Sequence, residues 1–218
     1  CIRDRHTTAR MEELMQEDTL KQFLPATESW FRKTFGEPTK IQREAWPAIA
    51  DGKHVLVSAP TGTGKTLSAF LVFIDQLGGL AERGELKEEL YVIYVSPLKS
   101  LAGDIRENLR KPLEGIGAEA PGESKAESRP GNPSIGQIQA AIRTGDTPQK
   151  ERQRMVKHPP HILIITPESL YLMLTSKSGR QVLKTAKAII LDELHALIDT
   201  KRAVSYTHLR AHETLANL

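Results

Sequence analysis

Cysteine is almost absent from this sequence, because only Cys1 among the 218 residues carries a thiol. A disulfide framework and a metal site made of several cysteines are therefore excluded, and a reducing, cytoplasmic setting is expected. The sequence also lacks any run of about eighteen apolar residues, and no basic segment followed by an apolar one stands at its start. We therefore predict no membrane span, no export signal and no membrane partner.

No charge of one sign dominates the chain either. The formal net charge is +3, and 26% of the residues are charged beside 39% that are hydrophobic, as is ordinary for a globular protein. A net charge this small is compatible with a nucleic-acid partner but does not require one. The length of 218 residues suits one large domain or two small ones. Because the first residue is not Met, we expect the chain to be a fragment of a longer protein.

The most informative stretch is residues 54–77, where an apolar run ends in a small-residue loop and a helical pattern follows. The loop reads Ala59-Pro60-Thr61-Gly62-Thr63-Gly64-Lys65-Thr66, which departs from the general phosphate-binding pattern only at its first glycine. Glycines there let backbone amides approach phosphate oxygens, and the helix that follows turns its positive end toward them. Lys65 can reach the β- and γ-phosphates, and the Thr66 hydroxyl can hold Mg²⁺.

A glycine turn with an incidental lysine is the alternative, and the strand before and helix after the loop argue against it. We therefore predict a nucleoside triphosphate site whose phosphate-binding residues are Thr61, Gly62, Thr63, Gly64, Lys65 and Thr66.

Strand patterns alternate with helix patterns along the chain, without hairpin signals. This alternation predicts an α/β fold with a mostly parallel sheet and helices on both faces. Short apolar runs predict strands at residues 54–58, 91–95, 138–142, 162–165 and 188–191. Helical spacing predicts helices at residues 39–49, 67–77, 98–111, 149–156 and 170–174, the second ending at Gly78-Gly79 and the third at Pro112. Polar motifs follow several strands, so they should converge at the carboxyl edge of the sheet.

The domain boundaries follow from composition. Residues 1–24 are polar and predict a loosely packed helix, so residues 1–27 are assigned as a flanking segment and residues 28–203 as the domain. Within the domain, residues 114–134 are rich in glycine, proline and charge without apolar periodicity, which predicts an exposed, mobile insertion. Residues 204–218 are assigned as a tail outside the domain.

The last predicted strand runs directly into Asp192-Glu193-Leu194-His195. An apolar strand that ends in two carboxylates suits Mg²⁺-dependent phosphoryl chemistry. Asp192 would bind the metal, and Glu193 would orient and deprotonate the attacking water. Acidic residues at a helix N-terminus are the alternative explanation, and the phosphate-binding loop elsewhere in the same predicted sheet favours the catalytic one.

These two motifs together resemble those of superfamily 2 helicases of the DExH type. The resemblance extends to Pro38-Thr39-Lys40-Ile41-Gln42, which is similar to the Q motif, and to residues 96–102 and 166–170, which are similar to motifs Ia and Ib. Finer features resemble the large helicase-related (Lhr) family, namely Ala45-Trp46-Pro47, residues 142–147 and residues 171–176. The resemblance covers roughly residues 28–202.

The resemblance implies the first RecA-like domain of an ATP-dependent 3′-to-5′ DNA helicase with a role in DNA repair. It implies that Gln42 selects adenine, with Phe35 or Pro38 against the base, and that Lys65, Asp192 and Glu193 are catalytic. Thr66 and Asp192 would hold Mg²⁺, and His195 would couple the nucleotide state to a partner domain. From its sequence position alone, a histidine there is more often a surface residue.

The implied nucleic-acid contacts lie in loops after strands. Backbone amides, hydroxyls and a few cations suit contacts with phosphates rather than with bases. A solvated charge is the alternative for Lys99 or Arg143. The basic residues Lys150, Arg152, Arg154 and Lys157 could supplement the strand-binding surface, but a solvated charge is the favoured interpretation for them. The implied contacts are Pro97, Leu98, Lys99, Arg143, Thr144, Gly145, Thr166, Pro167 and Glu168.

The expected nucleic acid is single-stranded or tailed duplex DNA. An RNA-directed helicase domain and a nucleic-acid-binding module that responds to nucleotide without hydrolysing it remain as alternatives. No second RecA-like domain is recognisable, so we expect the chain alone to bind nucleotide weakly and to hydrolyse it poorly. After Arg202 the family pattern stops, and residues 204–214 resemble translated sequencing-adapter read-through.

Overall fold

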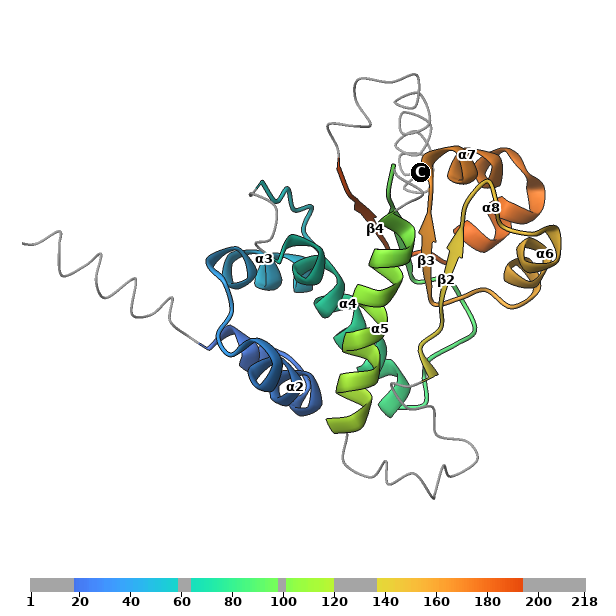
Figure 1. Cartoon of the computed structure of the whole chain (residues 1–218). Coiled ribbons are helices and arrows are strands. Elements are labelled where there is room, and N and C mark those ends of the chain that lie inside the picture. The colour runs from blue at the N-terminus through green and yellow to red at the C-terminus, as the bar shows by residue number, and fades with distance from the viewer. Residues whose placement is uncertain (1–17, 59–63, 98–100, 120–136, 194–218) are drawn as a thin grey trace, which may run out of the picture.

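The computed structural model describes residues 18–58, 64–97, 101–119 and 137–193. Within these ranges a short 3-10 helix, seven α-helices and four strands follow one another along the chain (Figure 1). They are η1 (Thr19–Gln22), α2 (Pro25–Phe35), α3 (Lys40–Ala50), α4 (Lys65–Glu82), β1 (Val92–Val95), α5 (Leu101–Glu119), β2 (Ala140–Arg143), α6 (Gln149–Lys157), β3 (Ile162–Ile165), α7 (Pro167–Thr175), α8 (Lys177–Leu183) and β4 (Ala188–Leu191).

The four strands form a parallel sheet in the order β2-β3-β1-β4. Every residue of β1 and β3 is buried, whereas β2 and β4 at the edges are half-buried. Continuous apolar strands are expected where helices cover both faces of a sheet. The predicted strands at 91–95, 162–165 and 188–191 are therefore confirmed, and the one predicted at 138–142 starts two residues later, at Ala140.

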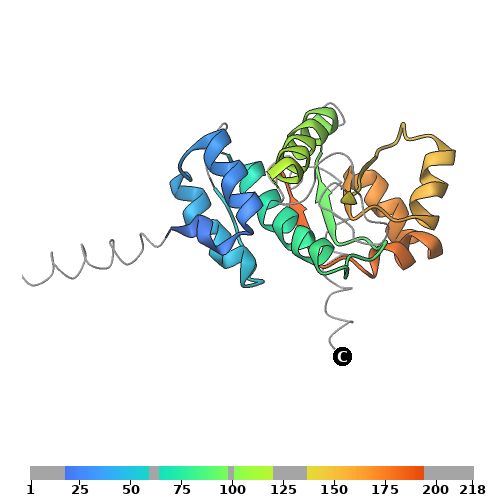
Figure 2. The same ribbon diagram turned by 90° about the horizontal axis from the view of Figure 1, so that it is seen from below.

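Helices cover both faces of this sheet, as predicted. Val92 and Tyr94 of β1 belong to a core shared with α2, α3, α4 and α5. The alternate residues Ile93 and Val95 belong to a second core, which contains Leu170 and Met173 of α7 and Val182 of α8. Because side chains alternate across a strand, this division assigns the two cores to opposite faces. Figure 2 shows the sheet between these two groups of helices.

The segment before α2 is more firmly packed than its composition predicts. Leu20 of η1 is fully buried and Phe23 is 7% exposed, and the Phe23 ring meets Trp46 edge to face with centroids 4.9 Å apart. The prediction of a loose helix is therefore wrong for residues 18–24, while residues 1–17 lie outside the described ranges. Leu20 and Phe23 hold this segment because both enter the main core and Phe23 meets Trp46 of α3, a contact that local periodicity cannot reveal.

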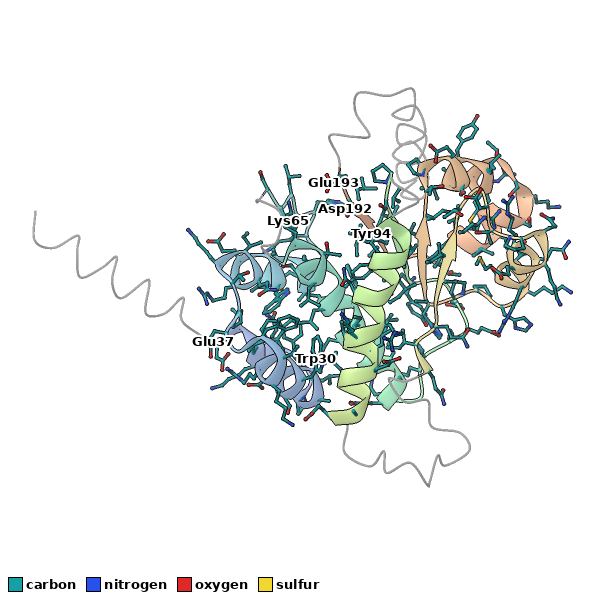
Figure 3. The ribbon with its side chains drawn as sticks, in the orientation of Figure 1. Trp30, Glu37, Lys65, Tyr94, Asp192 and Glu193 are labelled. Carbon is teal, nitrogen blue, oxygen red and sulfur yellow. The ribbon has the colours of Figure 1, made fainter. Side chains whose placement is uncertain are left out.

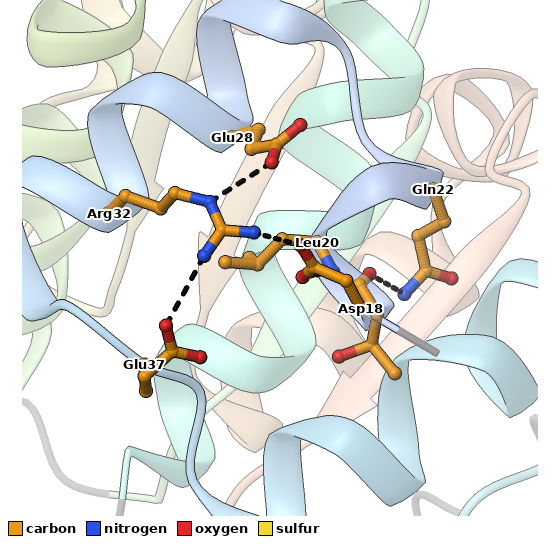
Figure 4. A network of polar contacts seen from close by, with 7 residues as sticks. Asp18, Leu20, Gln22, Glu28, Arg32 and Glu37 are labelled. Carbon is orange, nitrogen blue, oxygen red and sulfur yellow. Dashed lines mark hydrogen bonds and ion pairs between the residues drawn. The ribbon is translucent and has the colours of Figure 1, made fainter. Parts of the chain in front are cut away.

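Arg32 of α2 holds the same segment in place (Figure 4). Its guanidinium donates to Glu28 at 3.0 Å and to Glu37 at 3.3 Å, and it also pairs with Asp18. The hydrogen bond with Glu28 and the two nearby carboxylates at Glu28 and Asp18 raise the pKa of Arg32. One side chain thus links the segment before α2, the helix itself and the turn after it.

The strand predicted at residues 54–58 is absent from the described structure. These residues form neither strand nor helix, and Val55 and Leu56 are 38% and 81% exposed. A strand exists only where a neighbour accepts its backbone hydrogen bonds, however favourable its composition. Among the described residues, no strand pairs with this segment or with the outer edge of β4.

Two predicted helix ends are also wrong. Helix α4 continues through Gly78 and Gly79, both buried, to Glu82. Helix α5 continues through Pro112 to Glu119, so the first residues of the predicted insertion are helical, with Ile116 fully buried. Glu119 accepts hydrogen bonds from Ser29 and Lys33 of α2. Packing against neighbouring helices outweighs the local preference of glycine and proline to end a helix.

Candidate functional site

Gly64 joins the predicted phosphate-binding loop to α4. Its φ of +79° lies in the left-handed region, and a Cβ there would lie 2.9 Å from Nε2 of Gln42. Glycine alone satisfies both constraints without strain. The Gly64 carbonyl then accepts hydrogen bonds from the backbone amide and the hydroxyl of Ser68, at 2.9 and 2.8 Å. The first turn of α4, with Lys65 and Thr66, is thereby fixed directly after the loop.

Gln42 brings α3 against this turn. Gln42 is 4% exposed and completes a capping box with Thr39: its Oε1 accepts from the Thr39 amide at 2.9 Å, and its own amide donates to Thr39 Oγ1 at 3.4 Å. The residue expected from the sequence to contact adenine therefore lies beside the exit of the phosphate-binding loop. Capping fixes its side chain in that position.

Trp46 attaches α3 to α4 one turn further along. Its indole Nε1 donates to the Ser68 carbonyl at 3.1 Å, and the side chain is fully buried. The ring also meets Phe31 edge to face, with centroids 5.3 Å apart. Because Ser68 in turn binds the Gly64 carbonyl, Trp46 supports the start of α4 through a short chain of hydrogen bonds.

Asp192 and Glu193 lie at the carboxyl end of β4, beside β1. The Asp192 amide donates to the Val95 carbonyl at 3.0 Å, which continues the ladder between the two strands. Its Oδ1 accepts from the Glu193 amide at 3.0 Å. Glu193 has a φ of +50°, the only positive value for a non-glycine residue in the described ranges. Such backbone strain is often found at functional sites.

Tyr94 of β1 connects the two predicted halves of the site. Its hydroxyl donates to Asp192 Oδ2 and is also hydrogen-bonded to the Thr66 side chain. The ring is 1% exposed and stacks on Phe70 of α4, with centroids 4.7 Å apart. Burial, followed by the hydrogen bond to the Asp192 carboxylate, raises the pKa of Tyr94, so its hydroxyl stays protonated and remains a donor.

Figure 3 shows Lys65, Tyr94, Asp192 and Glu193 gathered at one edge of the sheet. The sequence predicts Tyr94 within a buried strand and indicates no role for its hydroxyl. A tyrosine two residues before a polar loop, in an otherwise aliphatic strand, is the one signal that could have identified it.

The donor set fits a hard divalent cation. Thr66 supplies a hydroxyl and Asp192 a carboxylate, the oxygen ligands that Mg²⁺ takes from proteins while it keeps several waters. Softer metals prefer sulfur or nitrogen ligands, and the described residues contain no cluster of three or more His, Cys, Asp or Glu side chains. Thr66 and Asp192 would therefore be able to hold a magnesium ion, which would neutralise charge on a bound phosphate.

The predicted nucleic-acid contacts occupy three neighbouring strand ends. Pro97 follows β1, Thr166 and Pro167 follow β3, and Arg143 ends β2. Thr166 and Pro167 are buried, whereas Glu168 is exposed. The parallel order of the strands brings these loops into one row along the carboxyl edge. Leu98 and Lys99 lie outside the described residues.

The loop after β2 has a fixed shape. The Thr144 amide donates to Thr147 Oγ1 at 2.8 Å, and Arg152 of α6 donates to the carbonyls of Thr147 and Gly145 at 2.7 and 2.6 Å. Arg152, which the sequence suggested as a solvated charge, is thus a structural donor. Four further predicted site residues, Thr61, Gly62, Thr63 and His195, fall outside the described ranges.

None of the described helices is long and apolar enough to cross a membrane.

The chain is similar to known helicases. A family model described as DEAD/DEAH box helicase matches residues 39–216. The chain is 48% identical over 180 residues to the ATP-dependent helicase Lhr-Core of Methanothermobacter thermautotrophicus, covering 83% of this chain and 20% of that protein. It is 46% identical over 185 residues to the Lhr helicase/probable uracil glycosylase of Mycolicibacterium smegmatis, covering 85% and 12%. The chain thus spans a fifth or less of the length of these relatives.

Solved structures have the same fold. The structure of Mycobacterium smegmatis helicase Lhr bound to ssDNA and AMP-PNP matches with a TM-score of 0.73 and 44% identity, over 86% of this chain and 22% of that one. The DEAD-box helicase Mss116 bound to ssRNA and UDP-BeF matches with a TM-score of 0.67 over 86% of this chain and 34% of that one. The latter is 19% identical, so it bears on the fold alone. Together the two confirm the predicted RecA-like fold.

Proposed function

The chain belongs to the DEAD/DEAH box helicase family, and from that premise we propose that it is the ATP-binding motor domain of an Lhr-type DNA helicase. The observation that carries the proposal is the hydrogen-bonded link from Thr66 through Tyr94 to Asp192. It joins the helix after the phosphate-binding loop to the strand that ends in Asp-Glu. Movement along DNA in the 3′-to-5′ direction and a role in DNA repair are part of the same proposal.

The residues of the site divide the chemistry among them. Lys65 binds the β- and γ-phosphates, Thr66 and Asp192 hold Mg²⁺, and Glu193 orients the attacking water and accepts its proton. Bound Mg²⁺ supplies neutralisation of the phosphate charge. Gln42 contacts adenine. Because its Oε1 already accepts a hydrogen bond from the Thr39 amide, the base binds the two Nε2 hydrogens and the second lone pair of Oε1.

The role of Tyr94 gives a first prediction. In Tyr94→Phe the ring keeps its stack on Phe70, but Asp192 loses a hydrogen-bond donor. Removing a group that orients a metal ligand typically costs about tenfold or more in metal affinity. We therefore expect ATP binding by the variant to require about tenfold more Mg²⁺ for half-saturation, measured by fluorescence of a labelled ATP analogue at varied Mg²⁺.

Tyr91→Phe is the matched control. Tyr91 lies just before the same strand, and its hydroxyl accepts from the Lys87 amide at 3.2 Å, away from the carboxyl end. Its Mg²⁺ dependence should equal that of the unmodified chain. Equal dependence in Tyr94→Phe as well would show that the hydroxyl does not position Asp192.

The proposed function itself is tested by nucleotide selectivity and nucleic-acid stimulation. The 218-residue chain should bind ATP in preference to GTP in the presence of Mg²⁺, and Gln42→Ala should lose that preference. On the protein at its full natural length, ATP turnover should rise with single-stranded DNA more than with RNA of the same sequence. Stimulation by RNA alone would replace the DNA assignment, and no nucleotide binding at all would refute the motor assignment.

A further inference from the structure

A cavity of about 590 Å³ lies on the flank of the domain beyond β2. Its walls come from the end of β2 and from α6, α7 and α8, which Figure 1 shows on the side of the sheet away from α3. None of its lining residues belongs to the nucleotide site. The cavity is lined by Arg143, Gln149, Arg152, Gln153, Val156, Lys157, Leu172, Ser176, Ser178 and Gly179.

The lining carries three cations and no acidic side chain. Arg143 is half-buried, and burial together with the neighbouring charge of Arg152 lowers its pKa. The acidic residues on these helices, Glu151 of α6 and Glu168 of α7, are both exposed and line no part of the cavity. Bringing two guanidinium groups together in a partly buried site is unfavourable unless an anion compensates them.

The rest of the lining is also suited to an anion. The Arg152 guanidinium donates to three backbone carbonyls, those of Thr144, Gly145 and Thr147. These hydrogen bonds fix the position of its positive charge. Ser178, Gln149 and Gln153 supply further polar groups around the cations, whereas the Ser176 hydroxyl already donates to the Met173 carbonyl at 3.2 Å. Arginine, lysine and hydroxyl groups are the usual partners of phosphate oxygens.

The sheet order relates this cavity to the rest of the molecule. From β4, which Asp192 directly follows, the order continues through β1 and β3 to β2. The row of strand-end loops therefore begins beside the nucleotide site and ends at Arg143, whose side chain lines the cavity. The cavity therefore adjoins the far end of this row at Arg143 and extends along α6 to Lys157, at the helix end that precedes β3.

We propose that the cavity between β2, α6, α7 and α8 binds a backbone phosphate of the nucleic acid, one step beyond the row of strand-end loops. The proposal rests on the proposed function, because it takes the bound polymer from there. It adds Lys157, Arg152 and the Ser178 hydroxyl to the surface that contacts the strand. Binding there is independent of base identity, since phosphates carry no sequence.

Lys157→Gln tests the proposal, with Lys150→Gln as its matched control. Both changes remove one positive charge from α6, but only Lys157 lines the cavity. For a labelled single-stranded DNA, Lys157→Gln should lower affinity several-fold and reduce the slope of log K against log salt by about 0.7. Lys150→Gln should leave that slope unchanged. Equal slopes for the two variants would overturn the proposal.

Two further measurements distinguish a phosphate of the nucleic-acid backbone from free inorganic phosphate. Titration of inorganic phosphate, followed by amide NMR, should perturb Ser178 and Gly179 in the unmodified chain and not in Lys157→Gln. The effect of Lys157→Gln should be present for long oligonucleotides and absent for ones too short to reach past β2. A perturbation by inorganic phosphate without any length dependence would overturn the nucleic-acid assignment.

If the proposed helicase function is wrong, a different pair of results is expected. In that case the unmodified chain would bind no single-stranded DNA at any salt concentration, while the NMR response of the cavity to inorganic phosphate would persist. Absence of both responses would refute the cavity as a phosphate site of any kind.

Discussion

Replacement of Lys65 by alanine is expected to weaken ATP binding by about tenfold to a hundredfold. A hydrogen bond to a charged group contributes about 1.5–3 kcal/mol, and about 1.4 kcal/mol corresponds to a factor of ten in affinity. Lys65 is the first residue of α4, immediately after the left-handed Gly64. Its ammonium group is thereby carried on a rigid turn at the point where the phosphates would lie. Titration of labelled ATP at fixed Mg²⁺ measures the loss.

Lys40→Ala provides the control for this change. Lys40 is the first residue of α3, its side chain is 83% exposed, and it pairs only loosely with Glu44 at 3.8 Å. Removing its charge should leave ATP affinity unchanged. If Lys65→Ala binds ATP as tightly as the Lys40 variant, with both folded by circular dichroism, the phosphate-binding role of the loop is wrong.

Trp46→Ala is expected to cause the largest loss of stability, about 3–5 kcal/mol. The side chain is fully buried, meets Phe23 and Phe31 edge to face, and donates to the Ser68 carbonyl. A domain is typically stable by only about 5–15 kcal/mol, so a large part of the chain should unfold at moderate urea. Urea denaturation followed by far-ultraviolet circular dichroism measures the change.

Two further variants separate the contributions of Trp46. Trp46→Phe keeps an aromatic ring and removes the indole N–H, so it should cost about 1–3 kcal/mol. Phe35→Ala removes a ring that is 53% exposed and should cost less than Trp46→Ala. Phe35 contacts the rings of Trp30 and Phe31 in α2. A loss in Phe35→Ala as large as that in Trp46→Ala would show that these ring contacts, rather than the contact between α3 and α4, govern stability.

The central strands and the general fold were predictable because their signals are local. The runs at 91–95 and 162–165 are apolar without interruption, and both strands are buried on two faces. The Asp-Glu pair was predictable for the same reason, since it directly follows such a run. The parallel arrangement then brings Asp192 to the edge where Thr66 lies, as alternating strands and helices require.

The contacts that depend on partners were not predictable. Tyr94 shows no sign in the sequence that its hydroxyl would meet both Thr66 and Asp192, because that contact depends on the relative positions of α4, β1 and β4. The run at 54–58 has the composition of a strand, yet the described structure gives it no partner. Pro112 would end an isolated helix, but α5 continues because α2 packs beside it. In each case tertiary packing decides what local preference leaves open.

The outer edge of β4 bears on how the chain associates with other protein molecules. Among the described residues, its backbone amides and carbonyls have no strand beside them, and its four residues, Ala188–Leu191, are all aliphatic. An open edge of aliphatic residues recruits strands from other molecules, which is the first step of edge-to-edge aggregation. Any self-association of the chain is therefore expected to begin at this edge, and light scattering at increasing chain concentration measures it.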